Sequence, residues 1–205
     1  MVHAIRYRTA VSKEKGRRLG RADWVDAALE ALAAGGVSAV AVEPVAVRLG
    51  TTKGSFYWHF ANRAELVTAA LAEWEQRYTE RVIADLAQIP EPGARLRGLF
   101  QRAFGGRLTG AIDAAVLADA ASPLVAPVLE RVTRRRLGYL HETYAAMGLP
   151  PDLAASRALL AYTTYVGLFS LRRAAPGVVS DVGLVDALEP LLAPARPDFG
   201  RDHAR

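Results

Sequence analysis

The sequence contains no cysteine and no long apolar run, and each absence excludes a class of protein. Without cysteine, the chain of 205 residues has no disulfide, no cysteine–zinc site and no thiol nucleophile. No uncharged stretch reaches the roughly 18 residues that a membrane helix needs, and no apolar segment of the export type lies near Met1. We therefore expect a cytoplasmic protein without a membrane-spanning segment.

Catalytic and metal-binding motifs are also missing. His141-Glu142 begins like a metalloprotease motif, but Ala145 stands where the second histidine belongs. The glycines between 105 and 110 have phosphate-loop spacing, but Ala111 replaces the required lysine. We expect no enzyme, no metal ion and no cofactor, although an active site assembled only in the folded chain would leave no such motif.

Helical periodicity dominates the chain, and no alternating strand pattern of useful length competes with it. With 51% hydrophobic residues, the sequence can bury a proper core. We predict an all-α fold in which a three-helix helix-turn-helix domain is joined by a long helix to a C-terminal helical bundle. The expected helices are one at about 21–34, two short ones on either side of Gly50, a long one from Asn62 to Pro90, and further ones at 93–105, 110–121, 123–147, 151–175 and 182–193.

The net charge of +5 is concentrated near the N-terminus. Residues 1–65 hold ten Lys/Arg and six Asp/Glu, which gives +4, whereas residues 66–205 contribute +1. Residues 1–20 lack an apolar period and are expected to form a mobile basic arm. This excess favours a polyanionic partner, although a basic tail that merely keeps the chain soluble would give the same count.

The stretch TTKGSFYWHF at 51–60 combines small and polar residues with four aromatic rings. A helix that enters the DNA major groove needs small side chains at its closest approach, donors nearby and a buried face that anchors it. Phe56 and Phe60 suit the buried face, and they would equally suit an aromatic mini-core. The candidate DNA-binding residues are Thr51, Thr52, Lys53, Gly54, Ser55, Tyr57, Trp58 and His59.

The run from Val45-Ala46 through Arg48-Leu49-Gly50 to TTKGSFYWHFANRAEL resembles the DNA-binding domain of the tetracycline-repressor (TetR) family of bacterial regulators. The resemblance covers residues 21–70 and implies a homodimeric repressor that binds a palindromic DNA operator and is released by a small apolar or aromatic effector. The implied groove-facing residues are Thr52, Lys53, Gly54 and Ser55, and the implied phosphate contacts are Tyr57 and His59. The family usually opens its second helix with a capping serine or threonine, and Ala41 stands there instead.

By the same resemblance, residues 21–65 are the helix-turn-helix DNA-binding domain and residues 66–205 a ligand-binding and dimerisation domain. Aromatic and polar side chains in the second part would either line a pocket or fill a core. The candidate pocket residues are Trp74, Phe100, Phe104, Tyr139, His141, Tyr144, Tyr162, Tyr165 and Phe169. The run Arg134-Arg135-Arg136 is expected to be solvated surface, because consecutive helix positions point about 100° apart and share no face.

The helices near 151–175 and 182–193 are the expected dimer interface. Pairing their apolar faces across a twofold axis would form a four-helix contact between identical subunits. The leucines and valine that form these faces are Leu153, Leu160, Val166, Leu171, Leu184, Leu188 and Leu191, with burial inside one monomer a rival interpretation for Val166. Two other functions remain open: a helical small-molecule-binding protein without operator-specific DNA binding, and a nonspecific nucleoid-type DNA binder.

Overall fold

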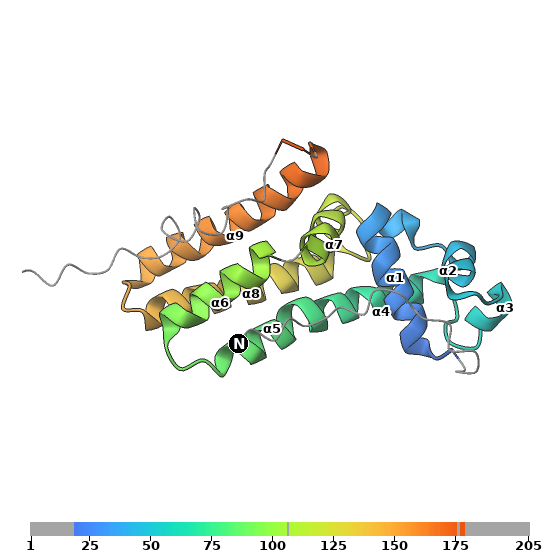
Figure 1. Cartoon of the computed structure of the whole chain (residues 1–205), viewed down its shortest axis with the longest axis horizontal. Coiled ribbons are helices and arrows are strands. Elements are labelled where there is room, and N and C mark those ends of the chain that lie inside the picture. The colour runs from blue at the N-terminus through green and yellow to red at the C-terminus, as the bar shows by residue number, and fades with distance from the viewer. Residues whose placement is uncertain (1–18, 106, 176, 179–205) are drawn as a thin grey trace, which may run out of the picture.

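The computed structural model describes residues 19–105, 107–175 and 177–178, which form helices and turns without a strand (Figure 1). The first helices of the chain lie at one end of an elongated molecule, and the later helices form the rest. The elements are α1 (Arg21–Gly35), η1 (Val37–Ala39), α2 (Val42–Leu49), α3 (Lys53–Phe56), α4 (Arg63–Glu75), η2 (Gln76–Glu80), α5 (Arg81–Ala87), α6 (Pro92–Gly105), α7 (Arg107–Ala118), α8 (Ala126–Ala146) and α9 (Pro151–Ala174). The predicted all-α architecture is confirmed, and none of the described helices is long and apolar enough to cross a membrane.

The helix-turn-helix of α2 and α3 rests on three buried aromatic rings. Trp24 of α1 meets Phe56 edge to face with ring centroids 5.4 Å apart, and Phe56 stacks on Phe60 at 5.5 Å. Gly50 ends α2 in the left-handed conformation with φ of 67°. Because a residue with a Cβ seldom adopts that conformation, this glycine sets the turn between the two short helices.

The long connecting helix begins where the sequence predicts. The side-chain oxygen of Asn62 accepts a hydrogen bond from the Glu65 amide at 3.0 Å, and the Glu65 carboxylate accepts one from the Ala61 amide at 2.7 Å. This reciprocal capping satisfies two amides that the helix itself leaves without partners. From this cap, α4, η2 and α5 run as one helical path toward the far end of the molecule (Figure 1).

The connecting helix is not uniform, because η2 is a π-helical turn that the sequence pattern does not predict. A π-turn inserts an extra residue into the helix and rotates the side chains that follow it. Tyr78 and Thr79 are therefore buried side by side in sequence. Beyond the turn, Ile83 is buried and its neighbour Val82 is only partly so.

Two apolar clusters hold most of the molecule together. The first joins α1 to α4 with residues of α7 and α8, so it spans both halves of the chain. The second lies among α6, α7, α8 and α9 and contains most of the aromatic side chains of the bundle. The first cluster contains residues from both sides of the predicted domain boundary at residue 65. That boundary therefore stays a prediction. The expected arm lies largely, and the expected helix at 182–193 entirely, outside the described residues.

Helix α7 connects the bundle to the helix-turn-helix. It packs against both α1 and α9 and lies between them in Figure 1. Just past its end, the Asp119 carboxylate accepts a hydrogen bond from the Val37 amide at 2.6 Å. Gly36 has φ of 72° and ψ of −164°, a region almost restricted to glycine, and a Cβ there would lie 2.4 Å from the Asp119 carboxylate. The end of α1 at Gly35-Gly36 is therefore also a place where this helix contacts the residue that follows α7.

Close approach of α7 and α9 gives a prediction about stability. A Cβ added to Gly110 of α7 would lie 1.8 Å from the Phe169 ring of α9, whereas one added to Gly138 of α8 would meet nothing within 4 Å. Gly110→Ala is expected to lower the free energy of unfolding by about 1–3 kcal/mol, because the ring must leave its place. Gly138→Ala is expected to raise it by about 0.5–1 kcal/mol through helix propensity. Urea unfolding measures both, and a stabilised Gly110→Ala variant would contradict the packing of these helices.

Candidate nucleic-acid interface and buried cavity

The short helix α3 and the turn that follows it divide their residues between an anchored side and an exposed side. Phe56 and Phe60 are buried in the aromatic cluster, whereas Tyr57 is 58% exposed and Trp58 is 86% exposed. Lys53 and its flanking residues Thr52 and Gly54 are exposed as well. Large exposed rings beside a buried aromatic anchor are unusual on a plain surface and mark a contact surface. The predicted division of TTKGSFYWHF into anchor and contact residues thus matches the observed burial, while DNA contact itself stays a prediction.

The remaining candidate DNA-binding residues surround a shallow hollow. It has a volume of about 240 Å³ and is lined by Leu19, Thr51, Ser55, Trp58 and His59. Thr51, Ser55 and His59 are each partly buried. The structure therefore brings the candidate residues of 51–59 together on one end of the molecule, next to the exposed α3.

Lys53 already has a partner in the free protein. Its ammonium donates a hydrogen bond to the Glu43 carboxylate of α2 at 2.8 Å. This hydrogen bond, reinforced by the attraction between the two charges, raises the pKa of Lys53 and lowers the pKa of Glu43. Both side chains are exposed, so the pair is screened by solvent and a phosphate can compete for the lysine.

The N-terminal ends of α2 and α3 have no side-chain caps. Ala41 occupies the N-cap position of α2, as expected from the sequence, and supplies no hydrogen bond. Thr52 occupies the N-cap position of α3, but its side chain makes no capping bond either. At both helix starts, backbone amides are consequently available to an acceptor such as a phosphate oxygen. A Cβ on Gly54 would meet only Thr52 at 3.6 Å, so packing does not require glycine there.

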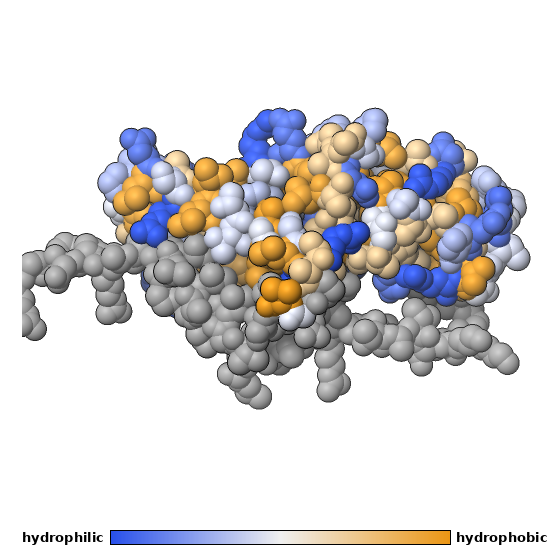
Figure 2. All heavy atoms as spheres, turned by 90° about the horizontal axis from the view of Figure 1, so that it is seen from above, coloured by the Kyte–Doolittle hydropathy of each residue, from blue (hydrophilic) through white to orange (hydrophobic). Residues whose placement is uncertain are grey.

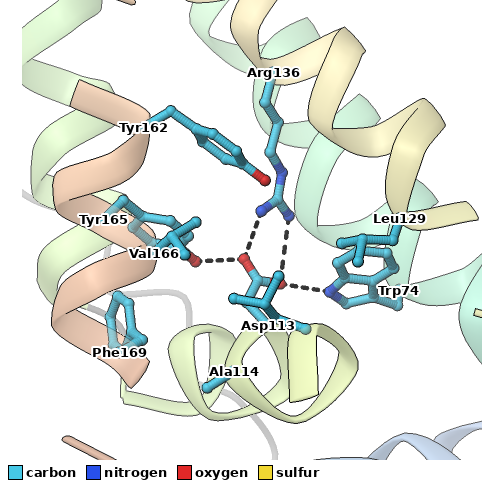
Figure 3. Close-up of a pocket in the computed structure, with 10 residues that line it drawn as sticks. Trp74, Asp113, Ala114, Leu129, Arg136, Tyr162, Tyr165, Val166 and Phe169 are labelled. Atoms are coloured by element: carbon cyan, nitrogen blue, oxygen red, sulfur yellow. Dashed lines mark hydrogen bonds and ion pairs between the residues drawn. The ribbon is translucent and has the colours of Figure 1, made fainter. Parts of the chain in front are cut away.

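A small cavity lies within the bundle between α4, α7, α8 and α9 (Figure 3). Its volume is about 20 Å³, the space of about one water molecule. The residues that line it are Trp74, Asp113, Ala114, Leu117, Leu129, Arg136, Tyr162, Tyr165, Val166 and Phe169. A molecule larger than one water therefore fits here only if the cavity becomes larger.

One carboxylate organises the polar side of this cavity. Asp113 Oδ1 accepts a hydrogen bond from Trp74 Nε1 at 2.6 Å, and Asp113 Oδ2 accepts one from the Tyr165 hydroxyl at 2.6 Å. The Arg136 guanidinium donates to both oxygens, at 2.5 Å and 3.4 Å. Figure 3 shows these donors converging on Asp113 from different helices. Arg136 also donates to the Thr79 hydroxyl of the π-turn at 3.0 Å.

Burial and charge act together on this cluster. Burial works to lower the pKa of Arg136, but the adjoining Asp113 carboxylate and two tyrosine hydroxyls outweigh it, so the pKa is raised. Burial raises the pKa of Tyr165 well above its usual value, and the negative charge of Asp113 adds to that effect. The arginine therefore stays charged and the tyrosine stays a neutral donor.

The expectation that Arg134-Arg135-Arg136 is solvated is wrong for its last residue. Arg134 is 76% exposed and pairs with Glu130, and Arg135 is part-buried beside Glu80. The Arg136 side chain is only 14% exposed. Three consecutive helix positions point in three directions, and one of those directions is inward. The same geometry that argues against a shared face therefore places one arginine in the bundle.

Of the nine candidate pocket residues, some line the cavity and the others lie elsewhere in the bundle. Trp74, Tyr162, Tyr165 and Phe169 line the cavity. Phe104 contacts Tyr165 with ring centroids 6.0 Å apart, and Phe100 lies beside Phe104. Tyr144 is buried in the same apolar cluster, Tyr139 packs in a separate one beside α5, and His141 is partly exposed on α8.

Sequence reasoning missed Asp113 and Arg136, the two charged residues of the cavity. They are 23 positions apart and belong to different helices. The available signal is an aspartate in the otherwise apolar run AIDAAVLA of α7, where a charge on the inward face needs a partner. That signal predicts a partner without identifying it.

The sequence of the helix-turn-helix matches known regulators. Residues 25–70 match the family model described as bacterial regulatory proteins of the tetR family. The chain is 44% identical over 48 residues to the HTH-type transcriptional regulator SrpR of Pseudomonas putida, and 38% identical over 63 residues to the uncharacterized HTH-type transcriptional regulator TtgW of the same species. These alignments cover 23% and 31% of this chain, but only 22% and 43% of the two relatives. Regulators of this kind support the prediction that the chain is not an enzyme.

Solved structures resemble the whole fold. The TetR transcriptional regulator from Legionella pneumophila has a TM-score of 0.75 at 12% identity and covers 87% of this chain and 100% of that chain. AibR in complex with isovaleryl coenzyme A and operator DNA has a TM-score of 0.62 at 17% identity, covering 83% and 96%. FadR from Bacillus subtilis in complex with stearoyl-CoA has 0.62 at 18% identity, covering 84% and 97%. At these identities the likeness concerns the fold.

The arginine run provides a matched test of the buried ion pair. Arg136→Met is expected to lower the free energy of unfolding by about 3–5 kcal/mol, because it leaves the Asp113 charge buried without its counter-ion. Arg134→Met, two positions away on the surface, is expected to cost about 0.5 kcal/mol or less. Adding Asp113→Asn to Arg136→Met should recover part of the loss. Equal urea midpoints for the two single variants would contradict the burial of the pair.

Proposed function

The chain belongs to the TetR family of bacterial regulatory proteins through its helix-turn-helix domain, and on this premise we propose that it is a ligand-responsive DNA-binding transcriptional regulator. It binds a palindromic operator as a homodimer and acts as a repressor. A small apolar or aromatic effector releases it. One observation carries the DNA part of the proposal: α3 and the turn after it expose Lys53, Tyr57 and Trp58, while Phe56 and Phe60 anchor them in the core.

The anchored helix suits the major groove. Small and polar residues at 52–55 allow close approach and offer donors, and the anchor fixes their direction. Tyr57 and His59 at the end of the helix hold phosphate oxygens in this proposal. Gly54 is not required by packing inside the protein. A need for glycine there would consequently come from DNA.

Helix α9 supports the homodimer. Leu153, Leu160 and Leu171, three of its four expected interface residues, are between 46% and 56% exposed, and Leu159 is 54% exposed. The fourth, Val166, lines the cavity and packs within the bundle. Figure 2 shows hydrophobic side chains among polar ones over the part of the molecule where α9 lies. Such a row of exposed leucines is costly for a monomer and suits a contact between identical subunits.

The effector site of the proposal is the cavity beside Trp74. AibR and FadR, which share the fold, hold coenzyme A esters of acyl chains. Here the cavity touches α4, which continues from the helix-turn-helix, and α7, which reaches it through Asp119 and Val37. Two reading helices must lie about 34–36 Å apart to meet successive major grooves. An effector that favours a different spacing by about 2.7 kcal/mol would weaken operator binding about a hundredfold.

Selection from a random duplex library tests the function as a whole. A palindromic consensus with a single footprint supports an operator-specific regulator. Binding to all duplexes alike would indicate a nonspecific nucleoid-type protein. Failure to bind any duplex would favour the alternative of a small-molecule-binding protein without operator-specific DNA binding.

The Lys53–Glu43 pair gives a two-way prediction for DNA affinity. Lys53→Ala is expected to weaken binding to the selected operator and to reduce the slope of log affinity against log salt by about 0.9 if the lysine contacts a phosphate. Glu43→Gln is expected to strengthen binding, because it frees the lysine from its partner in the unbound protein. Glu130→Gln, which removes an equal charge on α8, controls for net charge and should have no effect. Fluorescence anisotropy measures all three, and a Glu43→Gln variant indistinguishable from Glu130→Gln would refute the competition.

The exposed leucines of α9 predict the effect of a charge on assembly. Leu160→Glu is expected to convert a dimer into a monomer in sedimentation velocity, because two buried carboxylates would face each other near a twofold axis. Gln101→Glu on the exposed face of α6 serves as the control and should leave the dimer intact. A wild-type protein that sediments as a monomer, or a Leu160→Glu variant that remains dimeric, would exclude this interface.

A further inference from the structure

The Asp113 carboxylate fills a place where donors from three other helices converge. Trp74 of α4, Arg136 of α8 and Tyr165 of α9 all direct N–H or O–H groups toward its two oxygens. Trp and Arg side chains have no acceptor, so this place can be filled only by an acceptor or an anion. Trp74, Arg136 and Tyr165 are therefore an anion site, called here the donor site, and Asp113 is its present occupant (Figure 3).

The charge of Arg136 limits what can happen when a ligand enters. The guanidinium is buried against Trp74 and Tyr165, 5.4 Å and 6.0 Å from their ring centroids. Moving Asp113 away with nothing in its place would leave this charge buried and unpaired, which is strongly unfavourable. A ligand carboxylate in its place keeps the guanidinium paired and every donor satisfied, provided that the displaced Asp113 reaches solvent.

The rest of the cavity wall is apolar. Leu117, Leu129, Val166 and Phe169 lie around the donor site, so a molecule whose anion reaches Arg136 must place an apolar body against them. The free volume of about 20 Å³ accommodates neither part without a displacement. Asp113 is the one side chain whose departure both enlarges the cavity and vacates the donors.

We propose that the effector is an apolar molecule with a carboxylate, and that its carboxylate takes the place of Asp113 on Trp74, Arg136 and Tyr165. The word effector rests on the proposed function, whereas binding of a carboxylate at the donor site does not. The displaced Asp113 must turn away from the donors, and α7 must shift with it. Because α7 leads directly into Asp119, which holds the Val37 amide, this shift reaches the helix-turn-helix.

Formate rescue of Asp113→Ala tests the donor site without DNA. The variant lacks only the carboxylate, and formate has the size of the missing group. Its melting temperature is expected to rise saturably with sodium formate, by about 3 °C or more, above its value in sodium chloride of equal ionic strength. Asp113→Asn, which keeps the place filled, should respond equally to the two salts. If Asp113→Ala folds in sodium formate but not in sodium chloride, this result also supports the proposal. If formate raises the melting temperatures of Asp113→Ala and Asp113→Asn equally, the proposal is overturned.

The wild-type protein gives a second measurement, whose main comparison does not depend on the folding of Asp113→Ala. Benzoate and octanoate are each compared with benzamide and octanamide in a thermal-shift titration. The acids are expected to stabilise the protein more than their amides, and this difference should disappear in Arg136→Met. If the amides stabilise the wild-type protein as much as the acids or more, the proposal is overturned. This comparison decides the question when Asp113→Ala stays unfolded in both salts. Operator binding by the same wild-type sample tests the proposed function separately, since neither melting experiment contains DNA.

Discussion

The Asp113–Arg136 ion pair is the constraint around which the bundle is arranged. A charge in an apolar interior is tolerated only when its partners are complete, and here the partners come from α4, α8 and α9. Each of these helices must lie within hydrogen-bond distance of α7, so the cluster fixes their separations more tightly than apolar packing alone. The cavity is small for the same reason, because the donors draw the helices together around one carboxylate.

The π-turn in the connecting helix is part of the same arrangement. Arg136 reaches the Thr79 hydroxyl and the Tyr78 carbonyl, both in that turn. Both acceptors lie within the five residues of the π-helical turn, which places them toward α8. The helix that leads into the reading domain is consequently held at its one irregular point by the residue that also holds Asp113. Arg136 therefore links the cavity to the connecting helix, because it binds both Asp113 and the π-turn.

Local signals in the sequence predict much of the fold. The start of the long helix at Asn62, the first helix at about 21–34 and the short helix that ends at Gly50 depend on neighbouring residues, and the structure confirms them. The burial of Phe56 and Phe60 follows from their spacing in the same way. The Asp113–Arg136 pair and the π-turn were not predictable, because both depend on contacts between helices. An inward charge can be recognised locally, but its partner is determined by the assembled bundle.

Rigidity at the reading end and adjustability at the cavity end follow from different chemistry. The Trp24, Phe56 and Phe60 rings interlock with no buried charge among them, so α3 has one well-packed position on α1. The cavity instead depends on an anion, and in the proposed exchange another anion accepts the same hydrogen bonds from Trp74, Arg136 and Tyr165. A carboxylate can therefore exchange at one end of the molecule while the reading helix keeps its internal geometry. In the proposed exchange, what changes is the direction in which α4 and α7 present an unaltered helix-turn-helix.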